Sequence, residues 1–376
     1  MRTVLRDDHE LFRTQFRRFI EREIAPFHAQ WEREGIVPVE VWRKAGAEGF
    51  LCCLVPEELG GAGGDFGHST VIIEELASAN ATAVGFTTHS EICAPYILRY
   101  AADELKRQWL PAMISGETIC AIAMTEPGIG SDLRSLRTTA VREGDHYILN
   151  GQKTFITNGM NASRAIVAAK VEPRPDEKAI TLLCVEADSP GFSKGAKLEK
   201  IGLRGQDTCE LFFDNVRVPV ANRLGGEHSG FSYLMHELAQ ERMIIALRAA
   251  QSIETLLEET VAYTRQRKAF GKAILEYQNT RFKLAECKAQ ATMLRAFVDE
   301  CLHMLLEKRL TPDRAAMAKL VASEMQNRLL DEFLQLHGGY GFMSEYKVSR
   351  AWVDARVARI YGGTSEIMKE IIARTL

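Results

Sequence analysis

The sequence of 376 residues is longer than most single domains, so we expect two or three domains with an ample hydrophobic core. Its formal charge of −3, with acidic and basic residues spread along the chain, excludes the basic stripe of a nucleic-acid-binding protein and the polybasic patch of a membrane-binding one. The eight cysteines include no CxxC pair and mostly have apolar neighbours, which favours buried thiols and a reducing compartment.

The sequence predicts neither a targeting segment nor a membrane span. Asp7, Asp8 and Glu10 occupy the region where a secretory or mitochondrial leader would be free of acidic residues. The longest weakly charged run, 76–90, is too short and too polar for a transmembrane helix. We therefore expect a cytoplasmic protein, and the mature form of an organellar protein is left open.

Residues 1–117 are predicted to form an N-terminal helical domain. The apolar residues between Leu11 and Ile24 recur mostly every three to five positions, which places them on one face of a helix. A glycine-rich stretch at 60–67 resembles a phosphate loop, but it follows no predicted strand and lacks the GxGxxG spacing. We interpret it as an ordinary loop.

Residues 118–228 are predicted to form a middle β domain. Turn signals at 143–145, 150–151 and 214–215 separate short runs rich in β-branched residues. Because parallel crossovers need more chain than these gaps provide, we expect antiparallel pairing. The predicted strands are 119–124, 147–149, 165–171, 180–185 and 211–220.

Residues 229–376 are predicted to form a C-terminal helical bundle, so the fold class is α+β with the order α, β, α. Helical periodicity holds over about 145 residues, and the main breaker is Pro312. The predicted helices are 231–267, 274–308, 313–337, 346–359 and 364–374.

Candidate chemistry begins with the last seventeen residues, 360–376. Gly362 and Gly363 allow a ligand to approach the backbone, and they precede Thr364 and Ser365, which can cap a helix. Amide groups before a helix N-terminus can donate to an oxyanion or a phosphate. A plain glycine turn before a terminal helix is the alternative reading.

Four more motifs accompany this stretch. The turn at 125–132 (TEPGIGSD) offers two hydroxyls and several amides, and the segment at 150–159 (NGQKTFITNG) is predicted to be a hairpin that presents an aromatic ring beside a hydroxyl. The basic turn at 265–272 (RQRKAFGK) suits phosphate, and 335–341 (QLHGGYG) is another glycine turn after a helix. Each motif alone is also what ordinary turns and helix ends produce.

Taken together, in this order and spacing, the five stretches resemble the acyl-CoA dehydrogenase family over essentially the whole chain. The C-terminal stretch and the triplet Gln240-Glu241-Arg242 resemble the long-chain members most, and the isovaleryl members next. The resemblance implies a homotetramer, arranged as a dimer of dimers, that uses FAD to oxidise the Cα–Cβ bond of an acyl-CoA.

The resemblance also implies the cofactor site. Thr125 would reach the pyrimidine edge of the flavin, Phe155 would lie against the ring, Thr157 would lie near N5, and 335–339 would hold the adenosine end across a dimer interface. Phe155 replaces a tryptophan common in the family, and Ile122 replaces an aromatic residue; both departures change contact area more than chemistry. The full implied set is Ile122, Met124, Thr125, Ser131, Phe155, Ile156, Thr157, Arg267, Phe270, Gln278, Gln335, Leu336, His337, Gly338, Gly339, Thr364, Ser365 and Glu366.

The implied catalytic base is Glu241. Most members place a glutamate directly after the C-terminal tyrosine, where this chain has Gly362, whereas long-chain and isovaleryl members supply the carboxylate from the residue before a family arginine, here Arg242. A solvated helix charge is the alternative for Glu241. The pair His236-Glu237 suggests a zinc HExxH motif, but Gln240 occupies the second histidine position and no metal is expected. The implied substrate contacts are Ser131, Ser232, Ala239, Gln240, Arg242, Gly362 and Gly363.

In the implied reaction Glu241 removes the α-proton while the β-hydride passes to flavin N5, giving a trans-2-enoyl-CoA. The developing enolate would be stabilised by the Gly362 N–H and a ribityl hydroxyl. An electron-transferring flavoprotein would then accept the electrons. An oxygen-using acyl-CoA oxidase or flavin monooxygenase on the same fold, a non-catalytic acyl-CoA-binding protein and a plain helical interaction protein remain as alternatives. The sequence does not fix the acyl chain, for which medium, long and branched forms stay open.

Overall fold

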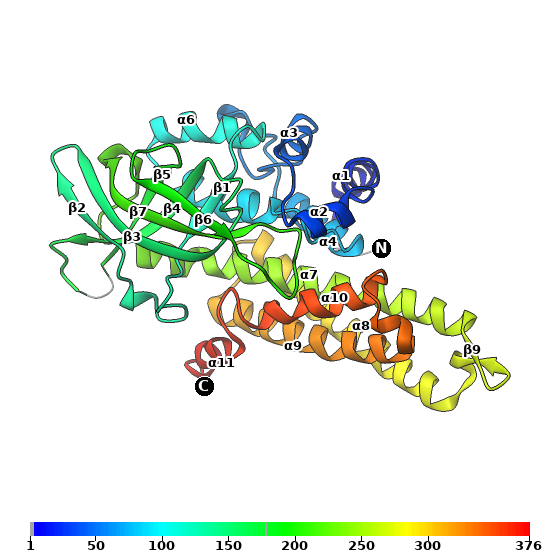
Figure 1. The fold of residues 1–376 in the computed structure, drawn as a ribbon. Coiled ribbons are helices and arrows are strands. Elements are labelled where there is room, and N and C mark those ends of the chain that lie inside the picture. The colour runs from blue at the N-terminus through cyan, green and yellow to red at the C-terminus, as the bar shows by residue number, and fades with distance from the viewer. Residues whose placement is uncertain (1–3, 177–178) are drawn as a thin grey trace.

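The computed structural model describes residues 4–176 and 179–376; residues 1–3 and 177–178 lie outside the described part. In Figure 1 the β-rich part of the chain lies on the left, and the C-terminal helices extend away from it to a small hairpin on the far right. All eight cysteines are buried and free, as the sequence suggested. Within the described residues, every helix is too short or too polar for a bilayer span.

The N-terminal part is helical, as predicted. Asp65 caps one of its two longest helices by accepting from the Gly67 N–H at 2.9 Å, and the glycine-rich stretch before Asp65 forms the expected loop. The elements are α1 (Asp7–Phe19), η1 (Ile20–Ile24), α2 (His28–Glu34), α3 (Val39–Ala47), η2 (Glu57–Leu59), α4 (Phe66–Ser78), η3 (Thr88–Cys93), α5 (Ala94–Tyr100) and α6 (Asp103–Ile114).

The middle part is a sheet with the strand order β6-β7-β3-β2-β4-β5-β8, and β1 pairs with β4 off this path. The strands are β1 (Cys120–Ala123), β2 (Thr139–Glu143), β3 (His146–Thr157), β4 (Arg164–Glu172), β5 (Ile180–Glu186), β6 (Phe192–Lys197), β7 (Thr208–Pro219) and β8 (Arg223–Leu224). Short 3-10 turns η4 (Leu133–Ser135) and η5 (Val220–Asn222) join them.

The expectation of purely antiparallel pairing is wrong for this sheet. β4 is parallel to both β1 and β2, whereas the other pairs within it are antiparallel. The chain between β2 and β4 is long enough for parallel pairing, because β3 follows β2 in the sequence, runs antiparallel to it on its other side and so forms part of the connection to β4. The sheet is therefore mixed.

The predicted hairpin at Asn150-Gly151 is also wrong. β3 continues through this pair, and the turn that precedes β3 lies at Gly144-Asp145. Asn150 and Asn215 exchange hydrogen bonds across a register shift between β3 and β7, so the predicted turn at 214–215 is likewise a bulge inside a strand.

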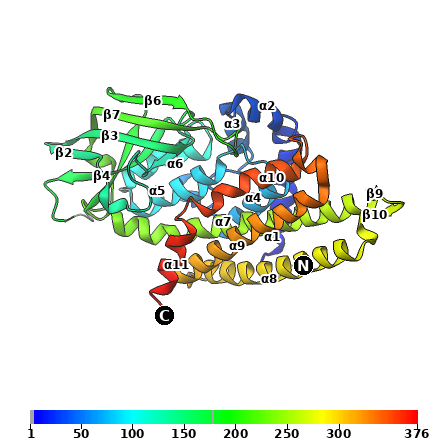
Figure 2. The same cartoon turned by 60° about the horizontal axis from the view of Figure 1, so that its bottom comes forward.

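The C-terminal part is a helical bundle, and the ends of its helices are close to those predicted. Figure 2 shows its long helices running side by side below the β-rich part. The elements are α7 (Gly230–Gln266), β9 (Lys268–Ala269), β10 (Lys272–Ala273), η6 (Ile274–Glu276), α8 (Gln278–Leu306), α9 (Pro312–His337), η7 (Gly338–Phe342), α10 (Lys347–Ala355), η8 (Arg356–Arg359) and α11 (Ser365–Ala373).

Burial on both faces of the sheet explains the continuous apolar runs of β4 and β5. Ile166 and Ala168 belong to a core shared with the N-terminal helices, whereas Val167 and Ala169 belong to a second core on the opposite face. A third core joins α4 to α7, α8, α9 and α10. Helix α7 therefore starts against the sheet and runs the whole length of the bundle.

Candidate functional site

The turn after β1 is held by two kinds of contact. Glu126 and Ile129 exchange backbone hydrogen bonds at 3.0 Å, which places Pro127 and Gly128 at the tip. Below the tip, the Glu126 carboxylate accepts from the backbone N–H groups of Arg137 at 2.7 Å and Thr138 at 2.9 Å. These contacts of Glu126 therefore hold the turn that carries Thr125 and Ser131 in one conformation.

A buried ion pair ties this turn to β3. Lys153, which is fully buried, donates to the Glu126 carboxylate at 2.9 Å and to the Met124 carbonyl at 3.1 Å. The Thr154 N–H donates to the Thr125 carbonyl at 2.9 Å. Lys153 was not predicted as a site residue, although a lysine on the inward face of a strand is a signal that could have indicated it.

A bulge in β3 turns Phe155 outward. Lys153 pairs with Leu211 and Ile156 pairs with Cys209, so β3 carries one residue more than β7 at this point. Lys153 and Thr154 are consequently both buried, and Phe155, with a φ of 59°, exposes 68% of its surface. Thr157 follows at the end of the strand and is half-buried.

Contacts from Lys153 and Thr154 join the two segments that carry the predicted cofactor residues of this region, and we name these residues the sheet cluster: Ile122, Met124, Thr125, Ser131, Phe155, Ile156 and Thr157. The Ile156 side chain itself is buried in the core on one face of the sheet. Open space surrounds the turn, because a Cβ added at Gly128 or Gly130 would meet no atom within 4 Å. An exposed aromatic face beside hydroxyl groups fits a flat heterocycle such as the flavin ring.

A second group lies at the far end of α7, and we name it the hairpin cluster: Arg267, Phe270, Gln278, Gln335, Leu336, His337, Gly338 and Gly339. β9 and β10 form a hairpin whose tip residue Phe270 is 97% exposed. The Arg267 guanidinium lies 5.6 Å from the centre of the Tyr340 ring, and the Tyr263 hydroxyl donates to the His337 carbonyl at 3.1 Å. An exposed arginine beside open glycines fits a phosphate-bearing ligand.

The structure does not bring the two clusters together within one chain. Helix α7 begins against the sheet, where Ser229 bridges to Ile180, and its 37 residues are about 55 Å long. The hairpin β9–β10 follows its last residue, at the opposite end of the molecule from β1 and β3 (Figure 1), and the end of α9 contacts α7 there through Tyr263 and His337. A single chain therefore presents two separate halves of the expected cofactor site.

Glu241 lies in the first third of α7 and is buried. Burial is the main cause that raises its pKa from 4.5 to about 7; a hydrogen bond from Tyr96 and the charge of Arg242 lower the pKa, and Glu237 raises it. The Tyr96 hydroxyl donates to Oε1 of Glu241 at 3.0 Å. The alternative of a solvated surface charge is therefore wrong for this residue. A carboxyl group with a pKa near neutrality can accept a proton at working pH.

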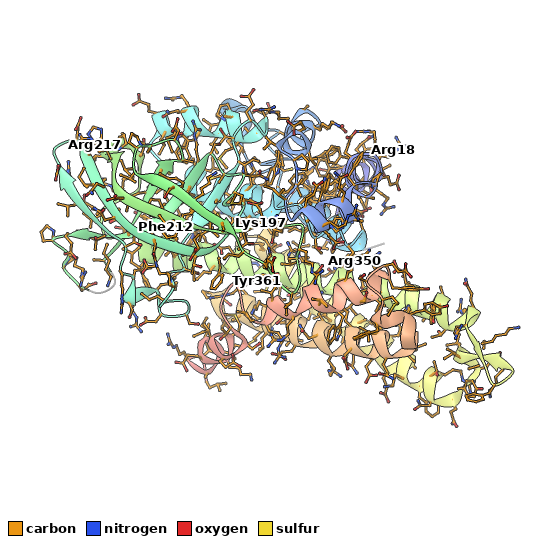
Figure 3. The ribbon with its side chains drawn as sticks, viewed as in Figure 1. Arg18, Lys197, Phe212, Arg217, Arg350 and Tyr361 are labelled. Carbon is orange, nitrogen blue, oxygen red and sulfur yellow. The ribbon has the colours of Figure 1, made fainter. Side chains whose placement is uncertain are left out.

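Ile245 connects the helix of Glu241 to the glycine turn. Ile245 stands one helical turn further along α7, and a Cβ added at Gly362 would lie 2.6 Å from its Cδ1 atom. Gly362 and Gly363 have φ angles of 64° and 91°, which favour glycine. Because residues four positions apart lie on the same side of a helix, we expect Glu241 to lie on the side of α7 that meets Gly362. Figure 3 places the preceding residue, Tyr361, where the β-rich part meets the C-terminal helices.

Buried side chains hold the glycine turn in place. Lys319, fully buried on α9, donates to the Gly363 carbonyl at 2.6 Å. Thr364 caps α11 by accepting from the Ile367 N–H at 3.2 Å, as predicted, and Ser365 donates to Glu324 at 2.5 Å. Glu366, also predicted for the cofactor, is exposed in the first turn. Lys319 was not predicted as a site residue, although a lone lysine within the alanine-rich run 315–322 is a signal that could have indicated it.

The predicted substrate residues on α7 differ in their surroundings. Ser232 is exposed and donates to the Ser229 carbonyl at 2.7 Å, and Ala239 is half-buried. Gln240 is buried, and both ends of its amide are engaged, with Glu91 and with Arg99. Arg242 is buried, and its Nε atom has no hydrogen-bond partner among the described residues.

Three family models match the chain in sequence order. The acyl-CoA dehydrogenase N-terminal domain matches residues 6–117, the middle domain matches 121–216, and the C-terminal domain matches 228–376. Together they span most of the sequence.

Individual relatives agree with these matches. The chain is 48% identical to the long-chain specific mitochondrial acyl-CoA dehydrogenase of Sus scrofa, over 100% of this chain and 88% of that protein. An acyl-CoA dehydrogenase from Geobacillus kaustophilus superposes with a TM-score of 0.97 at 47% identity, over 100% of this chain and 99% of the other. A glutaryl-CoA dehydrogenase from Mycobacterium smegmatis in complex with FADH2 gives a TM-score of 0.91 at 28% identity, over 99% and 95% of the two chains.

Proposed function

The chain belongs to the acyl-CoA dehydrogenase family, and on that premise we propose that it converts an acyl-CoA to a trans-2-enoyl-CoA with Glu241 as the base. The protein is a FAD-dependent oxidoreductase that acts on the CH–CH bond of an acyl-CoA. The observation that carries the proposal is a buried carboxyl group with a raised pKa, one helical turn from the residue that packs against Gly362.

The chemistry requires both a base and a donor to the thioester oxygen. An α-proton of a thioester is too weakly acidic for a carboxylate unless the developing enolate is stabilised as it forms. Glu241 would accept this proton. The backbone N–H of Gly362 would donate to the thioester oxygen, and the contact from Lys319 to Gly363 would hold that turn in place.

FAD fits the two clusters described above, and the chemistry that it supplies when bound is acceptance of a hydride from the β-carbon. The sheet cluster would hold the ring, because Phe155 offers an exposed face and Thr125 and Thr157 offer hydroxyls. The hairpin cluster would hold the pyrophosphate and adenosine, because Arg267 is an exposed guanidinium beside open glycines.

Since the two clusters lie at opposite ends of one chain, we propose that each FAD is held by two subunits. In a two-fold symmetric dimer, the sheet cluster of each subunit can meet the hairpin cluster of the other, so the dimer forms two complete sites. Two such dimers would give the homotetramer that the family resemblance implies.

For the substrate we propose a medium-chain, long-chain or branched acyl-CoA, because the long-chain relative shares 48% identity. We propose an electron-transferring flavoprotein as the acceptor. An oxygen-using acyl-CoA oxidase or flavin monooxygenase is the alternative on the same fold, and a non-catalytic acyl-CoA-binding protein is the remote one.

The test is anaerobic bleaching of the bound flavin by a panel of acyl-CoAs of different length and branching. We expect FAD to be released by heat without covalent attachment, bleaching by at least one saturated acyl-CoA, and the enoyl-CoA as product. Rapid reoxidation by an electron-transferring flavoprotein but not by oxygen supports the dehydrogenase. Equally fast turnover with oxygen alone would favour the oxidase, and binding without bleaching would favour the non-catalytic protein.

A further inference from the structure

A tyrosine from a different domain reaches the proposed base. Tyr96 lies on α5, and its hydroxyl donates to Oε1 of Glu241 on α7 at 3.0 Å, across 145 positions of the sequence. A phenol that donates to a carboxylate makes a charge-assisted hydrogen bond, which is stronger than one between neutral groups. The sequence contains no motif that connects the two residues.

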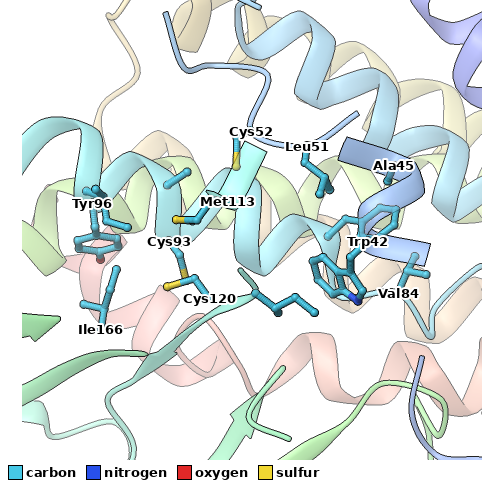
Figure 4. Close-up of a cluster of buried hydrophobic side chains, with 14 of the residues drawn as sticks. Trp42, Ala45, Leu51, Cys52, Val84, Cys93, Tyr96, Met113, Cys120 and Ile166 are labelled. Carbon is cyan, nitrogen blue, oxygen red and sulfur yellow. The ribbon is translucent and has the colours of Figure 1, made fainter. Parts of the chain in front are cut away.

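Tyr96 is held rigidly in its position. It is fully buried in the core that the N-terminal helices share with the sheet, and Figure 4 draws it with Cys93, Cys120 and Ile166 in that core. A π-helical segment, η3, runs directly into α5 and contributes Cys93. Such a side chain has little freedom to follow Glu241, so Glu241 must adapt to it.

Further contacts lock α5 and η3 to α7 around this hydrogen bond. Arg99 forms an ion pair with Glu237 and donates to the Gln240 amide oxygen at 3.3 Å. The Gln240 amide nitrogen donates to the Glu91 carbonyl in η3 at 2.9 Å. The tyrosine and the carboxylate are therefore fixed relative to each other by polar ties on the same face of α7.

The charged and titratable groups around Glu241 come from each packed element. Helix α7 contributes Glu237, which raises the pKa of Glu241, and Arg242, which lowers it; α5 contributes Tyr96, which lowers it. Arg99 neutralises Glu237 from α5, and η3 contributes the Cys93 thiol, whose own pKa is raised by burial. Lys319 on α9 and Arg242 carry like charges that repel each other. After burial itself, the Tyr96 hydrogen bond is the largest influence.

We propose that Tyr96 is a positioning residue for the reaction: its hydroxyl holds the Glu241 carboxylate in one orientation and stabilises the ionised form that accepts the proton. This inference rests on the proposed role of Glu241 as the base. Tyr96 acts through Glu241 and is not itself required to touch the acyl group.

The test compares Tyr96→Phe with the parent holoenzyme across pH. A donor to the ionised carboxylate lowers its pKa. Removing the hydroxyl should therefore shift the acid limb of the pH profile, where the bleaching rate falls as pH decreases, to higher pH by about one unit. At pH 6.5 the rate should fall roughly tenfold, whereas well above the limb it should stay within about threefold of the parent rate. General damage to the site would instead lower the rate at every pH.

Tyr100→Phe is the matched control. Tyr100 ends the same helix, but its hydroxyl donates to Glu237 at 2.9 Å instead of Glu241. We expect its acid limb to stay within about 0.3 pH unit of the parent limb, because Arg99 still pairs with Glu237. FAD content and unfolding midpoint, measured for both variants, establish that each is folded.

A second measurement does not depend on turnover. Infrared difference spectra of the holoenzyme against pH follow the carboxylic C=O stretch of Glu241, which is assigned by its loss in Glu241→Gln. The midpoint should move upward in Tyr96→Phe and not in Tyr100→Phe. If Tyr96→Phe changed neither the infrared midpoint nor the acid limb of the bleaching rate, the inference would be overturned. This would hold even if Glu241→Gln were inactive and the base assignment were intact. If Glu241→Gln bleached its flavin normally, the base assignment would fail, and the inference would fail with it.

Discussion

Glu241 is a carboxyl group that folding removes from water, so it should destabilise the folded protein wherever it is ionised. Its pKa in the folded chain is about 7, against an ordinary value of 4.5. Between these values the folded chain binds more protons than the unfolded chain, so the free energy of unfolding falls as pH rises through the window. The shift corresponds to roughly 3 kcal/mol above the window.

Replacing Glu241 by Gln should therefore stabilise the protein in a pH-dependent way. The gain should reach a few kcal/mol at pH 8 and disappear near pH 4.5, since a glutamine keeps the shape and cannot ionise. Unfolding midpoints at both pH values measure it. The control is Glu258→Gln, an exposed position on the same helix, which should change neither midpoint. A gain of equal size at both pH values would contradict this explanation.

At the scale of elements, β3 and the turn after β1 form one unit through the Lys153–Glu126 pair. Both partners are buried, so removing one leaves an uncompensated charge, at a cost of about 3–5 kcal/mol. We expect Lys153→Met to lower the unfolding midpoint and to weaken FAD binding, because Phe155 and Thr125 lose their common support.

Lys106→Met serves as the comparison for Lys153→Met. Lys106 pairs with the exposed Asp103 on α6, and such surface pairs contribute less than about 1 kcal/mol. Differential scanning calorimetry and flavin content, measured side by side, should separate the two variants clearly. Equal midpoints and equal FAD occupancy would show that the buried pair does not support the cofactor turn.

At the scale of the whole molecule, the separation of the sheet and hairpin clusters is the basis of our proposal that two subunits form each cofactor site. Arg267→Ala should lose FAD, whereas Arg265→Ala, an exposed neighbour in the same basic turn, should retain it. A double variant, Thr125→Val with Phe155→Ala, should also lose FAD, because it removes contacts from the sheet cluster.

Subunit mixing tests whether the halves come from different chains. Random mixing of the Arg267→Ala chain with the Thr125→Val, Phe155→Ala chain should restore about a quarter of the FAD sites, because each mixed dimer then contains one intact site. Absorbance at the flavin bands counts them, and unmixed variants give the baseline. No recovery on mixing would contradict a site shared between subunits.

Much of the fold follows from the sequence, because helical periodicity is a local property. The α, β, α order and the long helices were predicted within a few residues, for example 231–267 against Gly230–Gln266. β2 and β6 were missed, because charged and small residues obscure their alternation. The parallel pairs of β4 were missed, because pairing depends on which strands become neighbours in space.

Part of the candidate site could likewise be predicted from the sequence, and part of it could not. Motifs pointed to the glycine turns, and the family resemblance pointed to Phe155 and Glu241, whose roles stay predictions. They could not identify the bulge that turns Phe155 outward, because its register depends on β7. They also could not identify Tyr96, since nothing local connects α5 with α7.

The most direct test of the central claim is the rate of anaerobic flavin bleaching in Glu241→Gln, measured by rapid mixing with the best acyl-CoA of the panel. The variant should bind FAD and acyl-CoA normally, because glutamine keeps the shape and the hydrogen bond to Tyr96. Its bleaching should slow by at least about 100-fold, since the proton acceptor is lost. Glu258→Gln should bleach at the parent rate. Bleaching of Glu241→Gln within about tenfold of the parent rate would contradict the assignment of Glu241 as the base.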